Sequence, residues 1–262
     1  MAADSRRRTR QRHDKLLALV RSGRNGVHEL SAGLGVSPST VRRDLARLNE
    51  AGEITRTYGG AAALGFVERE LSERMHVEPS AKVAIGLAAA ELVPEHGTIF
   101  IDAGSTCAEM AGHLGGRSGL TVLTRGLEIA VQLASDPQLE VVVIGGQVAR
   151  KSHGTTGPLS EQSLNRYMVD VAFLGVDALD PHDGVGEPTL AEAQVKEAVA
   201  GRARRVVVLA DATKLDRGAM PAWAPLPSGW SLITNAADPE TLERYRSAGV
   251  DVTTIAGVGA GQ

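Results

Sequence analysis

Residues 37–52 read Ser37-Pro-Ser-Thr-Val-Arg-Arg-Asp-Leu-Ala-Arg-Leu-Asn-Glu-Ala-Gly52. The stretch predicts a helix, because Ser37 can cap an N-terminus, Pro38 suits the first helical position and Gly52 suits the far end. At 100° per residue the predicted helix has two chemically different sides. The apolar side comprises Val41, Leu45 and Leu48. The opposite side carries Ser39, Arg43 and Arg47, with Arg42 on the flank. One side can enter a small core while the other faces DNA, although an ordinary surface helix fits this pattern equally well.

The preceding residues favour the DNA-binding interpretation. Residues 13–22 and 27–34 each carry leucines and valines at helical spacing, and glycines separate the two segments. Gly35 and Val36 form a short turn before the helix that Ser37 opens. Two short helices around a tight turn predict a helix-turn-helix, whose second helix enters the major groove.

A predicted strand follows the recognition helix. Residues 54–58 read Ile-Thr-Arg-Thr-Tyr and are closed by Gly59 and Gly60. This arrangement predicts a wing, from which Arg56 and Tyr58 reach the sugar-phosphate backbone or the minor groove. Residues 1–60 hold 12 Lys and Arg against 6 Asp and Glu, whereas residues 61–262 hold 16 against 25. A basic first part joined to an acidic second part indicates that only the first meets a polyanion.

The composition limits the remaining classes of protein. The 262 residues suffice for one large domain or for a small and a medium one. The single cysteine, Cys107, excludes an intrachain disulfide and fits a reducing compartment. No apolar run approaches the roughly 18 residues of a membrane span, and no apolar core follows the N-terminal arginines. We therefore expect a cytoplasmic protein with no membrane partner.

The second part of the chain alternates between helices and strands. Residues 65–79 are too charged for a core strand and read as a linker that can form a helix. From residue 81 onward, short apolar runs alternate with helical segments as far as residue 255. This order predicts a Rossmann-like α/β domain with a mostly parallel sheet covered on both faces.

Polar residues cluster where the predicted strands end. The first strand runs into Asp102-Ala-Gly104-Ser105-Thr106 and a helix, which predicts a phosphate cradle. Later strands end in the following residues: Thr124 and Arg125, Gly145 and Gly146, Asp177, and the segment from Asp211 to Lys214. The carboxyl ends of parallel strands share one rim, so we expect a ligand pocket there. Lys196 lies four residues after Glu192, a spacing that favours a surface ion pair.

The recognition helix and wing resemble a known family. Val36-Ser37, Thr40-Val41-Arg42-Arg43-Asp44-Leu45 and the later Arg56-Thr-Tyr-Gly-Gly-Ala61 are similar to the DNA-binding domain of DeoR-type bacterial regulators of sugar metabolism. The resemblance implies that Thr40, Arg42 and Arg43 face DNA. Helical phase independently favours Arg43, and it leaves Arg42 either at the groove edge or paired with an acidic neighbour.

The second part resembles the DeoR sensor domain from about residue 74 to residue 255. The matching motifs are Asp-x-Gly-Ser-Thr at 102–106, Gly-Gly at 145–146, Gly157-Pro158, Phe-Leu-Gly-Val-Asp at 173–177, Glu-x-x-Val-Lys at 192–196 and Leu-Ala-Asp-x-x-Lys at 209–214. The resemblance implies a fold similar to ribose-5-phosphate isomerase and a phosphorylated sugar as effector. It places residues 102 and 104–106 at the phosphate, with Asp177, Lys196 and Lys214 lining the pocket.

Two positions depart from that family pattern. Arg125 stands where the family usually has Asn, and Ala178 stands where it usually has Gly. Arg125 can add a phosphate clamp, because guanidinium binds phosphate as a fork, or it can change or abolish effector binding. The segment 150–156, with Lys151 and His153, is a further expected effector-side loop; His153 is expected to be a loop residue and not a base.

The expected protein is a transcriptional repressor of carbohydrate genes that binds double-stranded operator DNA as a homodimer or homotetramer and is released by a phosphorylated sugar. The alternatives are a sugar-phosphate isomerase carrying a DNA-binding domain and a DNA-binding scaffold whose α/β domain only dimerises. No zinc-type spacing, P-loop or Gly-x-Ser-x-Gly element occurs, so we expect no catalytic residue, metal or cofactor. The expected divisions are a basic flexible tail (1–12), a winged helix-turn-helix (13–62), a linker (63–79), the sensor domain (80–256) and a flexible tail (257–262).

Overall fold

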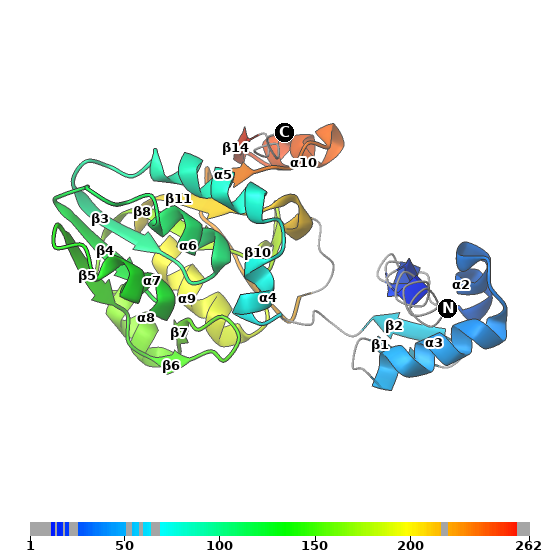
Figure 1. The fold of residues 1–262 in the computed structure, drawn as a ribbon. Helices are drawn as coiled ribbons and strands as arrows, with labels where there is room; N and C mark the ends of the chain where they lie inside the picture. Colours follow the sequence, from blue (N-terminus) through cyan, green and yellow to red (C-terminus); the bar gives the residue numbers. More distant parts are fainter. Residues whose placement is uncertain are drawn as a thin grey trace, which may run out of the picture. The chain divides into compact units, whose positions relative to one another are not determined.

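The computed structural model describes residues 12–13, 15–17, 19–20, 26–50, 54–57, 60–63, 69–215 and 220–255. The chain divides into two compact units, Met1–Val67 and Glu68–Gln262 (Figure 1). The expected tails at 1–12 and 257–262 lie outside the described residues, Arg12 excepted.

The first unit is a small helical domain with a hairpin. The described residues between 12 and 20 are helical, and α2 (Val27–Leu34), α3 (Pro38–Glu50), β1 (Ile54–Thr57) and β2 (Gly60–Ala63) follow. Gly35 ends α2 in the left-handed conformation with φ of 64°, which glycine adopts without a steric penalty. The predicted wing proves to be an antiparallel hairpin, in which Ile54 lies opposite Ala63. The sequence predicted only its first strand, because Gly60–Ala63 carries no strand-like pattern.

The core of this unit has the composition that the sequence predicts. It joins buried leucines and valines from all three helical segments, namely Leu16, Leu17, Val20, Val27, Leu30, Val41, Leu45 and Leu48. The Ser37 hydroxyl accepts a hydrogen bond of 3.3 Å from the backbone N–H of Thr40, as expected for a helix cap. The helix-turn-helix prediction is therefore confirmed.

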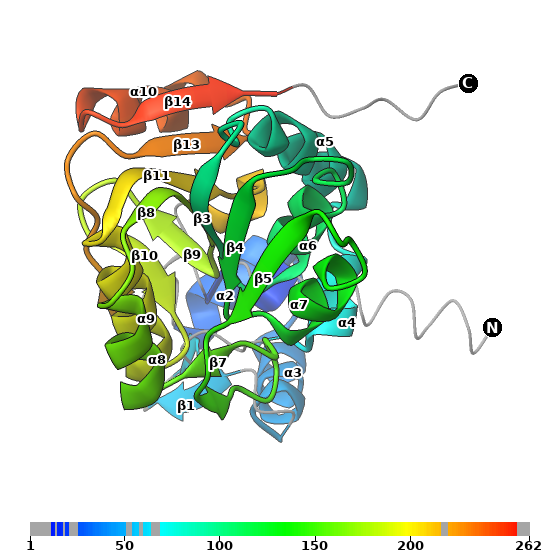
Figure 2. The ribbon, with the colours of Figure 1, turned by 90° about the vertical axis from the view of Figure 1, so that its left-hand side faces the viewer.

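The second unit is built on a seven-stranded sheet in which every neighbouring pair is parallel. The strand order is β14-β13-β11-β8-β3-β4-β5. These strands are β3 (Gly97–Ile101), β4 (Leu120–Thr124), β5 (Leu139–Val143), β8 (Val169–Gly175), β11 (Ala203–Leu209), β13 (Ser231–Thr234) and β14 (Asp251–Thr254). The predicted parallel α/β architecture is confirmed (Figure 2).

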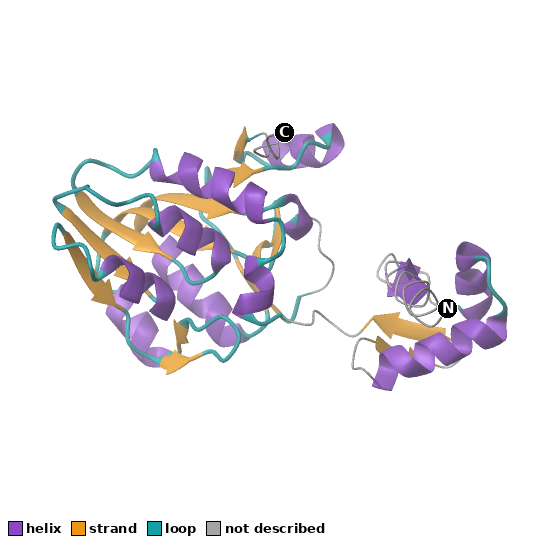
Figure 3. Cartoon of the chain, viewed as in Figure 1, coloured by secondary structure: helices purple, strands orange, loops and turns teal. Residues whose placement is uncertain are grey.

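Helices cover both faces of this sheet (Figures 2 and 3). Successive strand residues point to opposite faces, so Ile99 and Ile101 enter one apolar core and Phe100 enters the other. The first core is covered by α5 (Pro79–Ala90), α6 (Ser105–Ala111) and α7 (Leu127–Leu133). The second core is covered by α8 (Pro158–Leu164), α9 (Leu190–Ala200) and α10 (Pro239–Ser247).

Several short elements lie outside the main sheet. A short helix α4 (Leu71–Met75) precedes α5, and a 3-10 turn spans Ala212–Lys214. Two small antiparallel sheets comprise β6 (Gln147–Val148) with β7 (Thr155–Thr156), and β9 (Ala178–Asp180) with β10 (Gly184–Glu187) and β12 (Ala222–Ala224). The sequence does not predict these sheets, since strands of two to four residues show no periodicity.

The order of the strands reverses between β3 and β8. From β3 the chain adds β4 and β5 on one side, and then β8, β11, β13 and β14 on the other. At such a switch point the connections leave in opposite directions and open a crevice beyond the carboxyl ends of the strands. The residues that follow β3 and β8 are therefore the ones that the fold presents to a ligand.

Candidate functional site

The outer side of α3 carries the residues expected to meet DNA. Ser39, Arg42, Arg43 and Arg47 are exposed, and Thr40 is half-buried. The hydroxyl of Ser37 lies 2.9 Å from those of both Ser39 and Thr40, so three hydroxyls gather at the start of the helix. The side chain of Arg56 and all of Tyr58 lie outside the described residues.

Asp44 has a different role from the arginines before it. Its side chain is 2% exposed and accepts hydrogen bonds from Arg12 Nε at 2.6 Å and Nη2 at 3.1 Å. The ring of His13 lies 3.1 Å from the same carboxylate. Burial alone raises the pKa of Asp44, but Arg12 and His13 lower it below its usual value. The Asp of the Arg-Arg-Asp motif thus fastens α3 to the first helical segment.

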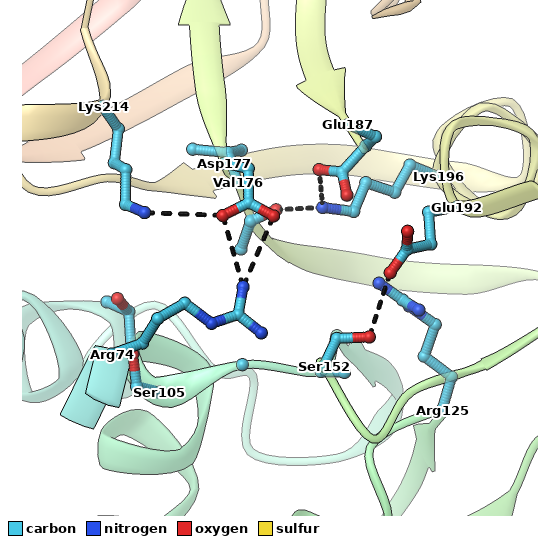
Figure 4. Close-up of a pocket in the computed structure, with 14 residues that line it drawn as sticks. Arg74, Ser105, Arg125, Ser152, Val176, Asp177, Glu187, Glu192, Lys196 and Lys214 are labelled. Carbon is cyan, nitrogen blue, oxygen red and sulfur yellow. Dashed lines mark hydrogen bonds and ion pairs between the residues drawn. The ribbon is translucent and has the colours of Figure 1, made fainter. Parts of the chain in front are cut away.

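A pocket opens at the switch point between β3 and β8 (Figure 4). It encloses about 410 Å³, counting the solvent at its mouth. The lining residues come from α4, α6 and α9, from the ends of β8 and β10, from the 3-10 turn and from several loops. They are Arg74, Ala103, Gly104, Ser105, Thr106, Arg125, Ser152, Gly175, Val176, Asp177, Glu187, Glu192, Lys196 and Lys214.

The start of α6 forms one wall of this pocket. Gly104 precedes the helix with φ of 119°, a conformation that L side chains rarely adopt. Among the described residues, no hydrogen-bond partner is seen for the hydroxyls of Ser105 and Thr106. The first backbone N–H groups of a helix also have no intrahelical acceptor, so this wall offers donors to an anion.

Lys196 lies at the centre of a buried ionic cluster. Its ammonium group donates to a carboxylate oxygen of Glu187 and to the carbonyl of Gly175, and lies 3.1 Å from Oδ2 of Asp102. Burial lowers the pKa of Lys196, but Asp102 and Glu187 raise it above its usual value. Lys196 therefore stays charged. It does not pair with Glu192, so the surface ion pair that spacing favoured is absent.

Glu192 takes a different partner. Its carboxylate accepts hydrogen bonds from the hydroxyls of Ser152, at 2.9 Å, and Thr189, at 2.8 Å. Ser152 thereby holds the loop 150–156 against α9, while the His153 ring turns to Glu128. Of this predicted effector-side loop, Ser152 lines the pocket, whereas His153 does not.

Arg125 is a buried cation beside the same cluster. Its Nε donates to Asp102, and its Nη1 is buried without a hydrogen-bond partner. Asp102 and Arg125 support each other, because the arginine and Lys196 lower the pKa of Asp102 against the effect of burial. Because Arg125 lines the pocket, this unpaired N–H group is a candidate hydrogen-bond donor to a ligand.

A second ionic group closes the opposite side of the pocket (Figure 4). Nη1 of Arg74 lies 3.2 Å and 3.4 Å from the two carboxylate oxygens of Asp177, and Nη2 donates to the carbonyl of Lys151 at 3.3 Å. Lys214 approaches the same Asp177 carboxylate at 3.6 Å. The Nε of Arg74 is buried and has no hydrogen-bond partner.

The charges of the lining favour an anionic ligand. Four cationic residues line the pocket: Arg74, Arg125, Lys196 and Lys214. They face three acidic residues, and Asp102 lies behind the lining. Burial raises the pKa of Glu187 to about 8, although the ammonium group of Lys196 opposes this shift. Within the lining itself, the four cationic residues outnumber the three acidic ones.

Not every predicted effector residue lines the pocket. Gly104, Ser105, Thr106, Arg125, Asp177, Lys196 and Lys214 do. Asp102 lies behind Arg125 and Lys196, and the Thr124 hydroxyl accepts from the backbone of Gly126 at 3.0 Å. Gly145 and Gly146 instead pack near Ser160, whose hydroxyl donates to the Gly145 carbonyl at 2.7 Å.

The pocket also contains residues that the predicted set lacks, namely Arg74, Ser152, Glu187 and Glu192. Glu192 lies within a motif of the sensor-domain resemblance and Ser152 within the expected effector-side loop 150–156, whereas Arg74 and Glu187 lie in segments without a predicted strand end. Within the described ranges, no three His, Cys, Asp or Glu side chains gather as a metal site requires. None of the described helices combines the length and apolar character of a membrane span.

Comparisons with known proteins agree over both units. Residues 12–65 match the DeoR-like helix-turn-helix domain, and residues 77–236 match the DeoR C terminal sensor domain. The chain is 34% identical to the HTH-type transcriptional regulator GlpR of Haloferax volcanii, over 92% of this chain and 96% of that protein. It is 32% identical to the HTH-type transcriptional repressor CsqR of Escherichia coli (88% and 90%).

Two further comparisons involve a glycerol-3-phosphate regulator and a solved structure. The chain is 32% identical to the glycerol-3-phosphate regulon repressor of Haemophilus influenzae, over 89% of this chain and 92% of that protein. Among solved structures, ribose 5-phosphate isomerase A of Methanocaldococcus jannaschii is 22% identical with a TM-score of 0.38, and the match covers 52% of this chain and 54% of that one.

Proposed function

The chain belongs to the DeoR family of transcriptional regulators, and from this premise we propose that it represses carbohydrate-metabolism genes until a phosphorylated sugar releases it from operator DNA. One observation carries the proposal. The chain joins a helix-turn-helix with exposed arginines to a cation-rich pocket in which two guanidinium groups have N–H donors without acceptors.

On the DNA side, α3 is the reading element. Arg42, Arg43 and Arg47 are exposed, so they are available to bases and phosphates. Ser39 and Thr40 stand at the start of the helix, where side chains and free N–H groups meet phosphate or base edges. The hairpin β1–β2 supports the assignment of Arg56 and Tyr58 to a wing beside this helix.

On the ligand side, phosphate is assigned to the α6 wall. Gly104, Ser105 and Thr106 offer backbone and hydroxyl donors there, and Arg125 adds its free Nη1. Asp177, Lys196 and Lys214 are assigned to the hydroxyls or to a further phosphate oxygen of the sugar. Asp102 holds Arg125 and Lys196 in place from behind, whereas Thr124, Gly145 and Gly146 shape the neighbouring loops.

Membership in a family of regulators confirms the prediction of a regulator over the alternative of a sugar-phosphate isomerase. A sensor must bind its ligand without consuming it. The same pocket can therefore serve a binding equilibrium, in which the ligand prefers one state of the protein and shifts the fraction bound to DNA.

The assembly and location extend the proposal. We assign residues 13–62 to DNA binding, 63–79 to the linker and 80–256 to effector binding and oligomerisation. A homodimer or homotetramer would present paired α3 helices to repeated half-sites. The proposed location is the cytoplasm, where both operator DNA and phosphorylated sugars occur.

A titration of the full-length protein tests the proposal. The protein is bound to a DNA fragment from upstream of its own gene, and anisotropy follows the addition of glycerol 3-phosphate, ribose 5-phosphate, fructose 1-phosphate, fructose 6-phosphate and fructose 1,6-bisphosphate. We expect at least one of these to weaken DNA binding by roughly five- to 150-fold, the usual range of allosteric coupling. The matching unphosphorylated sugars serve as controls.

If none of the sugar phosphates alters DNA affinity, the proposed effector class is wrong while DNA binding stands. If the protein converts any of them to an isomer, the assignment as a sensor without turnover fails. Light scattering of the same samples measures the oligomeric state, and a monomer at micromolar concentration would contradict the proposed assembly.

A further inference from the structure

Arg74 belongs to α4, the first described helix of the second unit. This helix has only five residues, and an isolated helix of that length is unstable in water. Its conformation must therefore come from its contacts with the rest of the unit. The chain immediately before it connects to the DNA-binding unit.

Contacts with α5, with α6 and with the pocket wall hold α4 in place. Leu71 is buried, α4 packs against α6, and Glu70 and Glu73 form a reciprocal cap at its start. Lys82 of α5 donates to the backbone carbonyl of Arg74. A further anchor is the Arg74 side chain, which reaches Asp177 after the end of β8 and the carbonyl of Lys151. One of the main anchors of α4 is thus part of the pocket wall.

The Arg74 guanidinium does not use all of its N–H groups in contacts with the described residues. Its Nε is buried and has no hydrogen-bond partner. An unpaired buried N–H is unfavourable, and a charged donor gains more than a neutral one when an acceptor arrives. A ligand oxygen beside Arg74 would supply that acceptor while Nη1 keeps its contacts with Asp177.

We propose that Arg74 couples occupancy of the pocket to α4: an oxygen of the anionic ligand accepts from Nε and stabilises the docked position of the helix. The inference rests on the proposed function, since it takes an anionic effector as the ligand. A ligand that contacts Arg74 only when α4 is docked favours the docked state, and by reciprocity docking favours the ligand. The fraction of molecules in which α4 is docked then rises with the concentration of the effector.

The test uses the full-length chain with Arg74→Gln and, as a matched control, Arg69→Gln. Arg69 is an exposed arginine of the same segment. Each of the five sugar phosphates is the probe. Calorimetry measures its affinity, hydrogen exchange measures protection of residues 70–77, and anisotropy measures release from DNA. We expect Arg74→Gln to lower the affinity for the active probe about tenfold. We also expect the variant to lose the protection of residues 70–77 that a saturating concentration of this probe induces in wild type. Arg69→Gln should behave as wild type.

A second variant covers the case in which Arg74→Gln leaves α4 frayed without ligand. Arg74→Lys keeps a positive charge that can pair with Asp177, but lysine has no counterpart of the Nε–H donor of arginine. We therefore expect α4 to be docked in this variant without the probe, and to gain little protection when the probe binds. If wild type responds and both variants gain the same protection, the inference is overturned while the proposed function stands. If no sugar phosphate acts on wild type, the proposed effector fails and the inference fails with it.

Discussion

Arg43 tests the recognition helix at a single residue. Its side chain is exposed on α3, so Arg43→Ala should leave stability within about 0.5 kcal/mol of wild type. We expect operator affinity to fall by about 1–3 kcal/mol, the usual worth of an arginine that reads a base. Anisotropy with operator and scrambled DNA separates base contacts from phosphate contacts. Arg246→Ala, an exposed arginine of α10, is the control; retained operator specificity in Arg43→Ala would refute the assignment.

Gly154 leaves the space that buried Arg125 occupies. A Cβ atom at Gly154 would lie 2.4 Å from Nη1 of Arg125 and 2.8 Å from Cβ of Ala103. We expect Gly154→Ala to destabilise the protein by about 1–3 kcal/mol, as overpacking does. With the shorter side chain of Arg125→Asn present, the added cost should shrink by about 0.5 kcal/mol or more. Urea unfolding of the double-mutant cycle measures this.

Gly115→Ala is the matched control for that cycle, because a Cβ atom at Gly115 meets nothing within 4 Å. Strict additivity of Gly154→Ala and Arg125→Asn would mean that the two residues do not constrain each other.

Glu187 gives the pocket a dependence on pH. Burial raises its pKa to about 8, and a bound anion favours the neutral carboxyl further. The empty pocket loses this proton as pH rises through about 8, so sugar-phosphate affinity should fall there by at most about tenfold per pH unit. Calorimetry in buffers of different ionisation enthalpy counts the proton taken up on binding.

Glu187→Gln isolates that contribution. Lys82 also titrates near the pocket, since burial lowers its pKa to about 8, and its loss of charge acts in the same direction. In Glu187→Gln, sugar-phosphate affinity should therefore still fall as pH rises, but less steeply than in wild type. An unchanged profile in Glu187→Gln would show that the carboxyl is already ionised in the empty pocket.

At the scale of elements, Asp44 holds α3 against the first helical segment through Arg12 and His13. Its pKa is lowered in the folded state, so its stabilisation is present above the ordinary carboxyl pKa of about 3.9 and is lost as pH falls through the lower folded value. Asp44→Asn should cost about 1.5–3 kcal/mol at neutral pH and flatten this acid-induced loss. The hydrogen-exchange rates of the α3 backbone amides measure this loss of stability in the first unit.

In that experiment the β8 amides serve as an internal reference in the other unit, and Asp183→Asn replaces an exposed aspartate as the control. Equal exchange of α3 in Asp44→Asn and wild type would show that Arg12 and His13 contribute nothing to holding α3 in place.

Elements whose pattern is local were predictable from the sequence. The helix at 27–34 has the predicted bounds, because glycines on either side and apolar spacing mark it directly. The parallel strands were also visible as short apolar runs. In contrast, β10 contains Gly184 and Gly186 and becomes a strand only through its partners β9 and β12. No local pattern encodes such a pairing.

The same distinction holds for the pocket. Residues after parallel strands converge whatever the side chains, so Asp177 and the Gly104–Thr106 segment could be placed in advance. Arg74 reaches Asp177 across 103 residues of sequence, from a segment whose charges look like those of any linker. The sequence leaves Arg125 either as a phosphate clamp or as a change that alters or abolishes effector binding, and its burial against Asp102 could not be foreseen from its position after a strand.

For the whole molecule, the uneven charge predicts a strong effect of salt on DNA binding. Residues 1–60 carry 12 basic and 6 acidic side chains, and the remainder is acidic. If an assembled pair of DNA-binding units contacts about six to ten phosphates, affinity should fall by roughly 10³ to 10⁵ between 50 and 200 mM salt. Anisotropy across a potassium chloride series measures the slope, and a flat dependence would contradict the proposed phosphate contacts.

The central place of β3 also sets the order in which the protein can mature. Ile99 of β3 pairs with Val171 of β8, so the first strand of the sheet waits for a partner that is synthesised much later. Pairings so distant in sequence form slowly, whereas the helices before residue 50 need only neighbours already made. A nascent chain can thus complete its DNA-reading unit before the crevice between β3 and β8 exists. A chain arrested before β8 would contain a folded DNA-binding unit but no ligand pocket. The ability to respond to a metabolite is therefore acquired after the ability to bind DNA.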